Sequence, residues 1–202
     1  MKGSLNNCLL ARVGRGIERR RYKLSVRLVG HRLDFAPRVF ALATDPPVRD
    51  ALGLRDQSIE DTRTFIRAVI EEERRGESLS RVILNENDAV IGVTTLMHFN
   101  MSRTHCHLGT WIGYQYWGMG YNLESKHAIL RIAFEQLHLD WVFLGARVVN
   151  TRSQRAQAKL PYISLDVGTK FVEERLALER RENQACVLNG VCRENFLAYL
   201  NR

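Results

Sequence analysis

Apolar and polar positions recur along the chain with two different periods, and the period predicts which segments form helices and which form strands. From residue 58 to 75 apolar side chains return every three or four residues, which predicts an amphipathic helix capped by Ser58 together with Asp61. Residues 80–84 and 89–97 flank a polar turn and predict a β-hairpin. The two periods together predict a mixed protein of helices and strands.

The other segments extend this order. Asp34 is expected to cap a helix that runs to Ala43, and Pro46 and Pro47 are expected to end that helix. With the hairpin, the chain is expected to have about seven strands. Further helices are expected at 121–137 and 151–160, and further strands at 22–29, 106–112, 141–149, 173–179 and 186–191.

The stretch from Gly109 to Ser125 holds the most specific chemical signal. Gly118 and Gly120 lie between an apolar strand and the start of a long helix. Glycines at such a position leave several backbone N–H groups unobstructed, and the helix adds the positive end of its dipole. The stretch therefore predicts a cradle for a phosphate group.

Two common phosphate-binding motifs do not fit this loop. A Walker loop needs a lysine and then a serine or threonine after its last glycine, and here Tyr121 and Asn122 follow Gly120. A dinucleotide fingerprint needs an acidic residue about 20 positions on, at the end of the next strand, whereas Asp140 lies before that strand. A third kind of phosphate-bearing ligand is therefore considered.

The loop reads Tyr-Trp-Gly-Met-Gly over residues 116–120, with Glu124 soon after it. Residues 150–155 read Asn-Thr-Arg-Ser-Gln-Arg and close a later strand. This combination resembles the acetyl-CoA site of the GNAT superfamily of N-acetyltransferases, in its ribosomal-protein (RimJ/RimL-like) branch. The resemblance covers about residues 22–200, and it is most specific between Gly109 and Leu160.

The resemblance implies an α+β GNAT fold, in which helices flank a twisted, mostly antiparallel sheet and the fourth and fifth strands splay apart. It implies one acetyltransferase domain at 22–202 after an extension at 1–21, and acetyl-CoA as cosubstrate without a metal. The residues it assigns to acetyl-CoA are Trp111, Ile112, Gly113, Trp117, Gly118, Met119, Gly120, Tyr121, Asn122, Asn150 and Ser153. The aromatic residues among them are expected in the core or in the wall of the pantetheine tunnel.

Transfer of an acetyl group also needs groups that stabilise the oxyanion and move protons. The family's oxyanion donor is a backbone N–H of the fourth strand, here within 108–111. His107 takes the place where relatives often carry a glutamate and is a candidate general base, although it also suits a half-exposed sheet position. Glu124 is an alternative base or an orienting group, and near a helix start it also suits the dipole.

The tyrosine that many family members use to protonate the leaving thiolate is absent, since Gln157 stands at its position. Ser153 is the nearest replacement, and its alternative role is a hydrogen bond at the helix start. Tyr162 is a more remote candidate that better suits the core. His98, His105, Cys106 and His107 cluster in sequence, but a zinc site needs a fourth ligand and a strand register that the sequence does not provide, so no metal is expected.

Composition agrees with a single soluble enzyme domain. The chain has 202 residues, of which 45% are hydrophobic and 26% charged, and it has no run of apolar residues long enough to cross a membrane. Its four cysteines form no CxxC pair, which favours free thiols in a reducing cytoplasm.

The excess of basic over acidic residues lies in the amino-terminal part of the chain, residues 1–32. Residues 1–32 contain nine basic residues and one acidic residue, which account for the formal net charge of +8, while the other 21 basic and 21 acidic residues cancel. This amino-terminal arm is interpreted either as a contact for RNA, a ribosome or an acidic partner, or as a solvated extension.

Three functions remain open from the sequence. The first is acetylation of a protein amino terminus, such as that of a ribosomal protein, by direct attack of the amine in a ternary complex. The second is acetylation of a small amine or an antibiotic. The third is a non-catalytic domain that binds an acyl-CoA. The sequence does not separate a monomer from a homodimer.

Overall fold

The computed structural model describes residues 26–53, 58–102 and 104–201. Its centre is one open sheet with the strand order β1-β2-β3-β4-β5-β6. Neighbouring strands are antiparallel except β4 and β5, which are parallel. The strands are β1 Arg27–Val29, β2 Leu79–Leu84, β3 Val90–Met97, β4 His105–Ile112, β5 Trp141–Arg147 and β6 Cys186–Cys192.

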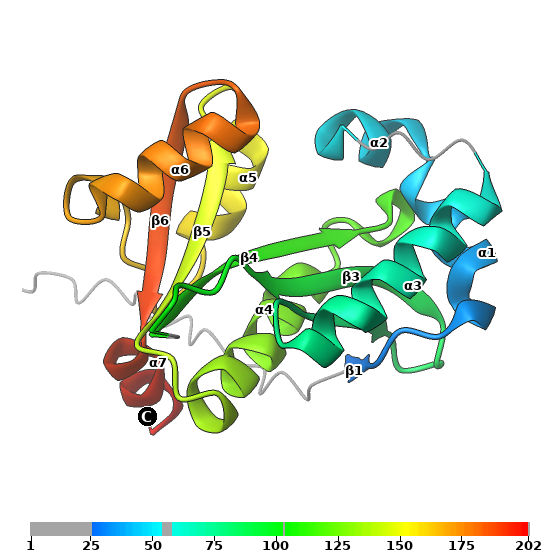
Figure 1. Ribbon diagram of the computed structural model, residues 1–202, viewed down its shortest axis with the longest axis horizontal. Helices are drawn as coiled ribbons and strands as arrows, with labels where there is room; N and C mark the ends of the chain where they lie inside the picture. The colour runs from blue at the N-terminus through cyan, green and yellow to red at the C-terminus, as the bar shows by residue number, and fades with distance from the viewer. Residues whose placement is uncertain (1–25, 54–57, 103, 202) are drawn as a thin grey trace, which may run out of the picture.

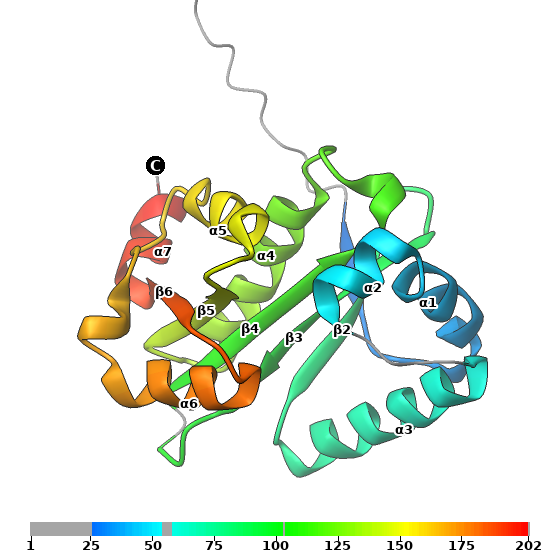
Figure 2. The same ribbon diagram turned by 90° about the horizontal axis from the view of Figure 1, so that it is seen from above.

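Helices pack on both faces of this sheet. Figures 1 and 2 show α1, α3 and α6 on one face and α4, α5 and α7 on the other. The helices are α1 Ala36–Ala43, α2 Pro46–Leu52, α3 Ile59–Arg75, α4 Tyr121–Arg131, α5 Thr151–Ala158, α6 Val172–Glu182 and α7 Arg193–Leu200. A π-helical turn, Ile132–Gln136, continues α4 toward β5.

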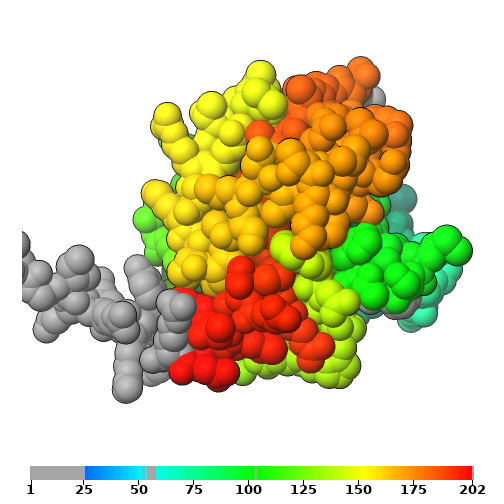
Figure 3. Space-filling model, turned by 90° about the vertical axis from the view of Figure 1, so that its left-hand side faces the viewer, coloured from blue at the N-terminus to red at the C-terminus, as the bar shows by residue number. Residues whose placement is uncertain are grey.

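The main core lies between the sheet and the helices α4 and α7. Cys106 and Leu108 of β4 pack there with Ile129, Phe134 and Phe196. Figure 3 shows the outer surface of this end of the molecule, where the segment with α5 and α6 lies above α7. A smaller cluster joins α6 to β5 and β6 on the opposite face.

Several predicted elements differ from the structure in detail. The described residues form six strands, because the expected strand at 173–179 lies within α6. Acidic residues in the first turn and basic residues in the last turn of this segment favour a helix. The capping box of Ser58 and Asp61 at the start of α3 is confirmed.

The helix predicted from Asp34 to Ala43 ends at the predicted residue, but its start differs and the two prolines have a further role. Asp34 lies in a short 3-10 turn, and the N-cap of α1 is Phe35. Pro46 and Pro47 begin α2 instead of only ending α1, because the first turn of a helix needs no backbone N–H from them. The first part of the strand expected at 22–29 and the whole arm at 1–21 lie outside the described residues.

The expected splay between β4 and β5 is confirmed. The two strands pair only where His105, Cys106 and His107 face Trp141, Val142 and Phe143. Beyond this short ladder β4 continues to Ile112 and β5 to Arg147, and Figure 1 shows the two strands diverging. Backbone groups of β4 after His107 that face β5 therefore have no strand partner.

Candidate active site

A cavity of about 240 Å³, here called the splay cleft, opens between the diverging strands. Residues 108–110 of β4 form one wall, and residues 144–147 of β5 form the other. The remaining lining comes from four helices: Ala51 of α2, Lys126 of α4, Ser153 and Gln157 of α5, and Leu178 and Glu182 of α6, with Asn150 at the start of α5. The sequence brings these groups together because β4 and β5 stop pairing after three residues.

The glycine loop leads from β4 into α4 at the edge of the splay. Gly118 and Gly120 have φ values of 79° and 95°, a region that favours glycine. A Cβ atom at either position would meet nothing within 4 Å, so the backbone there faces open space. Gly120 is the N-cap of α4 and receives no side-chain cap hydrogen bond. The first N–H groups of α4 are thus available to an anion.

Aromatic side chains hold this loop in place. The indole N–H of Trp117 donates a 2.6 Å hydrogen bond to the carbonyl of Ile112. The guanidinium of Arg152, on α5, lies 3.2 Å from the centre of a Trp117 ring. The Tyr121 hydroxyl donates to the Glu86 carboxylate at 2.9 Å. The loop is therefore anchored on three sides and carries a cation beside it.

The residues at the start of α5 form a hydrogen-bonded chain along the cleft. The Asn150 side-chain oxygen accepts from the N–H of Ser153 at 3.0 Å and caps α5. The Gln157 amide donates to the Ser153 hydroxyl and to the Gly145 carbonyl, and its oxygen accepts from Asn189 at 2.7 Å. Gln157 thus links α5 to β5 and β6 by hydrogen bonds. It stands at the position where the resemblance implies a tyrosine.

A second cavity of about 540 Å³, here called the α3 cavity, lies between α3 and the sheet. Its lining includes Phe65 and Glu72 of α3 and Glu77 between α3 and β2. Met97 and His98 at the end of β3 and residues 109–111 of β4 complete this part of the lining. Gly109 and Thr110 line both cavities, so the two meet at this point of β4. A Cβ atom at Gly109 would lie 2.9 Å from Met97 Cε, so a larger residue here would require the Met97 side chain to move.

The α3 cavity carries acidic and imidazole groups. Glu72 accepts a hydrogen bond from the Ser78 hydroxyl at 3.1 Å, and Glu77 accepts from Arg75. The imidazole of His98 lies beside them and is partly open to solvent. Desolvation of the part that the protein covers lowers its pKa below the usual value. From the sequence, His98 is a candidate only for a metal site, and Glu72 and Glu77 give no signal. The packing of α3 on the sheet places all three at one cavity.

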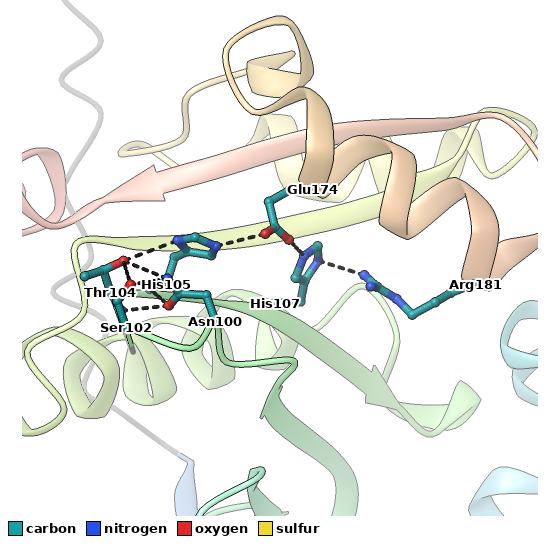
Figure 4. A network of polar contacts seen from close by, with 7 residues as sticks. All are labelled: Asn100, Ser102, Thr104, His105, His107, Glu174 and Arg181. Atoms are coloured by element: carbon teal, nitrogen blue, oxygen red, sulfur yellow. Dashed lines mark hydrogen bonds and ion pairs between the residues drawn. The ribbon is translucent and has the colours of Figure 1, made fainter.

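Figure 4 shows the surroundings of His107. Its Nε2 and that of His105 lie 2.8 and 2.9 Å from the two oxygens of Glu174, which projects from α6. Its Nδ1 lies 3.5 Å from a guanidinium nitrogen of Arg181. Burial, only partly opposed by the bond to Glu174, lowers the pKa of His107 to about 4. Both ring nitrogens are therefore occupied, and His107 is neutral at physiological pH.

The structure places the other predicted site residues as follows. Gly113 and residues 117–120 lie on either side of a short 3-10 turn between β4 and α4, and Tyr121 and Asn122 begin α4. Asn150 and Ser153 face the splay cleft. Trp111 lines the α3 cavity instead, and Ile112 is buried in a core cluster. Tyr162 is core, because it is 3% exposed and surrounded by aromatic rings. Glu124 is buried in the first turn of α4 and is not among the residues that line either cavity.

Lys126 lines the splay cleft and was not singled out from the sequence. Its side chain is only 6% exposed, and its ammonium lies 2.5 Å from the Asn122 side-chain oxygen. Burial lowers the pKa of Lys126 to about 8. A signal existed, since Lys126 precedes Ile129 by three and Leu130 by four residues and so shares their buried helix face.

Among the described residues, no group of three or more histidine, cysteine, aspartate or glutamate side chains is arranged to hold a metal. Cys106 lies in the core, while the histidines on either side of it bind Glu174. No helix in the described part of the chain is long and apolar enough to span a membrane.

The acetyltransferase (GNAT) domain family matches residues 25–162. The chain belongs to the GNAT family. It is therefore an acetyltransferase, and its splayed β4 and β5 and its glycine loop are parts of the GNAT domain. No curated protein matches the chain.

Solved structures with a similar fold have diverse acceptors. RimL, a ribosomal L7/L12 alpha-N-protein acetyltransferase, matches with a TM-score of 0.63 and 17% identity over 70% of this chain and 78% of RimL. A chimera of spermidine N-acetyltransferase SpeG from Vibrio cholerae and hSSAT matches with 0.64 and 14% identity over 86% and 98%. The microcin C7 self-immunity acetyltransferase MccE, in complex with acetyl-CoA and AMP, matches with 0.62 and 15% identity over 70% and 80%. At such identities the likeness shows the fold.

Proposed function

We propose that the protein transfers the acetyl group of acetyl-CoA to the α-amine at a protein amino terminus, by direct attack within a ternary complex. The observation that carries this proposal is the meeting of the splay cleft and the α3 cavity at Gly109 and Thr110. Two ligands that enter from these two cavities have their reactive ends side by side, which is what direct transfer requires.

The splay cleft suits acetyl-CoA. The open backbone at residues 118–122 would bind the pyrophosphate, and the Asn150 and Ser153 side chains would contact the pantetheine arm. The complex of MccE with acetyl-CoA supports this assignment. Acetyl-CoA supplies the activated thioester, and the unpaired N–H groups within 108–111 of β4 would donate to its carbonyl oxygen.

We assign the base to the α3 cavity. The His98 imidazole is exposed there, and because its pKa is lowered it is neutral at physiological pH and can take a proton from an amine. The His98 and His107 rings make an edge-to-face contact at 5.9 Å. His107, the base candidate from the sequence, would therefore act through His98, with Glu174 fixing its ring. Glu124 would stabilise the first turn of α4.

A small polyamine is the second candidate acceptor. Glu72 and Glu77 place two carboxylates at the α3 cavity, and these attract amines with more than one positive charge. The SpeG chimera supports this alternative as RimL supports the first. Peptides and polyamines are therefore both tested.

The arm and the cell compartment belong to the same proposal. We assign residues 1–21 to an extension that binds RNA or an acidic partner and residues 22–202 to the enzyme domain. Removing 1–21 should then abolish a salt-dependent association and leave acetyl-CoA binding unchanged. The free thiols of Cys106, Cys186 and Cys192 support a reducing cytoplasm.

Thiol release from acetyl-CoA tests the proposal directly. A panel of peptides with free amino termini, the same peptides with blocked termini, and spermidine would be compared. Release with free peptides alone would support the first acceptor, and release with spermidine alone would support the second. Binding of acetyl-CoA without release for any amine would overturn the proposed activity.

A further inference from the structure

Lys126 is a buried cation in the wall of the splay cleft. It lies on the second turn of α4, on the helix face that packs against the sheet, and it is 6% exposed. An ammonium group loses much solvation energy on burial, so such a lysine needs partners or a function. One hydrogen bond, to Asn122, holds one of its three N–H donors. Lys126 also lines the cleft that the proposed function fills with a thioester.

The reaction leaves one group without a proton donor. When the amine displaces coenzyme A, the C–S bond breaks and its electron pair stays on sulfur, which then needs a proton. Gln157, at the position where the resemblance led us to expect a tyrosine, is an amide bound to Gly145, Ser153 and Asn189. An amide does not release a proton near neutral pH. The Ser153 hydroxyl can donate a hydrogen bond, but its proton is held far too tightly for transfer.

We propose that Lys126 is the acid that protonates the departing thiolate of coenzyme A. In this step a Lys126 N–H bond breaks and an S–H bond forms, which leaves neutral Lys126 and the free thiol. The proton that the acceptor amine gives up to the base returns to Lys126 through solvent. This inference rests on the proposed function, and it adds a catalytic residue to it.

The electrostatic surroundings fit this role. The lowered pKa of Lys126, about 8, has burial as its cause and lies close to the usual pKa of a thiol. Donor and acceptor of matched pKa exchange protons readily. The anionic cosubstrate would raise the pKa of Lys126 and keep it protonated at neutral pH.

The other charged groups around Lys126 have partners of their own. Arg147 and Glu182 line the same cleft and lie 3.8 Å from each other. Glu124 shares the helix and is buried. Of the strands packed on α4, β1 carries Arg27, which binds Asp88, and β4 carries His105 and His107 on its opposite face, bound to Glu174. The described part of β3 from Val90 to Met97 carries no charged residue.

Titration of the bound thiol tests the proposal without turnover. Coenzyme A would be added to the wild type and to Lys126→Met, and thiolate absorbance would be followed against pH. An ammonium beside the sulfur lowers the pKa of the thiol, so we expect the bound thiol of Lys126→Met to titrate at least about one unit higher than in the wild type. Equal thiol pKa values would place Lys126 away from the sulfur and overturn the proposal.

Kinetics provide the second test. Lys126→Met should lower kcat by about 100-fold while acetyl-CoA affinity changes little. It should also lack the alkaline fall in kcat that we expect of the wild type when Lys126 deprotonates in the complex. Lys126→Arg keeps the charge but not the labile proton, and should also be impaired. Full rescue by arginine, or an unchanged alkaline limb in the methionine variant, would contradict proton transfer.

Lys159→Met, at an exposed lysine after α5, is the matched control and should behave as the wild type. Methionine at 126 removes a buried charge, so Lys126→Met should unfold at the same or a higher temperature. A structural role for Lys126 predicts the reverse, a lower unfolding temperature with kcat preserved. If the wild type releases no thiol with any amine, the proposed activity fails, and the coenzyme A titration still decides the placement of Lys126.

Discussion

The glycine loop beside the splay cleft and the α3 cavity are built in different ways. The glycine loop beside the cleft is a run of consecutive residues whose backbone faces open space. The α3 cavity depends on side chains from α3, the segment after it, β3 and β4, which lie far apart in the sequence. The difference implies that the proposed binding of the cosubstrate's pyrophosphate follows from local backbone geometry, whereas acceptor choice follows from tertiary packing and can change within one fold.

Replacing Gly120 by valine tests whether the backbone of the glycine loop binds acetyl-CoA. A β-branched residue disfavours a φ of 95°, and its methyl groups would cover the N–H groups that we propose bind the pyrophosphate. We expect acetyl-CoA affinity, measured by calorimetry, to fall by about 100-fold, the effect of losing one or two charge-assisted hydrogen bonds. Gly76→Val, at a φ of 71° after α3, introduces similar strain away from the loop and should leave this affinity unchanged.

Acid should lower the stability of the folded protein, because two buried histidines on its α3 and α6 face are neutral. Burial lowers the pKa values of His31 and His107 to about 4, whereas in the unfolded chain histidine titrates near 6.5. The unfolded chain therefore takes up protons first, and stability is full above about pH 6.5 and lost as the pH falls toward 4. Thermal unfolding followed by circular dichroism should show this decline, and His107→Gln should make it shallower. His138→Asn, at an exposed histidine, should leave the slope as it is.

Glu72→Gln tests whether side chains of the α3 cavity bind the acceptor. Glu72 is half-buried at the α3 cavity, and loss of its charge should raise the KM for a cationic acceptor by about fivefold, the effect of one partly exposed ion pair. The KM for acetyl-CoA should stay unchanged. Glu71→Gln, the exposed neighbour on α3, is the matched control. A rise in the KM for acetyl-CoA instead would mean that the two cavities do not divide the substrates as proposed.

Asn150→Ser should give the smallest change and separates two roles of one side chain. Serine can keep the cap on the Ser153 N–H, but it loses the amide that faces the cleft. The KM for acetyl-CoA should rise by about threefold, as expected for one neutral hydrogen bond. Asn150→Ala should show this rise and a loss of about 1 kcal/mol of stability as well, because the cap is gone. If serine restores the KM fully, the amide makes no contact with the pantetheine arm.

Local signals predicted much of the fold. The cap at Ser58, the hairpin of β2 and β3, and the strand, loop and helix around Gly118 all depend on residues close in sequence. The signal failed at α6, where Leu178 packs against Gly145 and tertiary contact selects a helix over the expected strand. It also missed Lys126 and the place of His98 at the α3 cavity, because these cavities are lined by residues of several elements that are distant in the sequence.

Because Gly109 and Thr110 line both cavities, acetyl-CoA in the splay cleft and an acceptor in the α3 cavity, bound as proposed, would lie against the same two residues. Each will then change the affinity of the enzyme for the other by the same factor, whichever binds first. A single molecule that joins coenzyme A to the acceptor amine through the acetyl carbon would occupy both walls at once. Its second half would bind at the effective concentration that the tether sets, so its affinity should exceed that of either substrate.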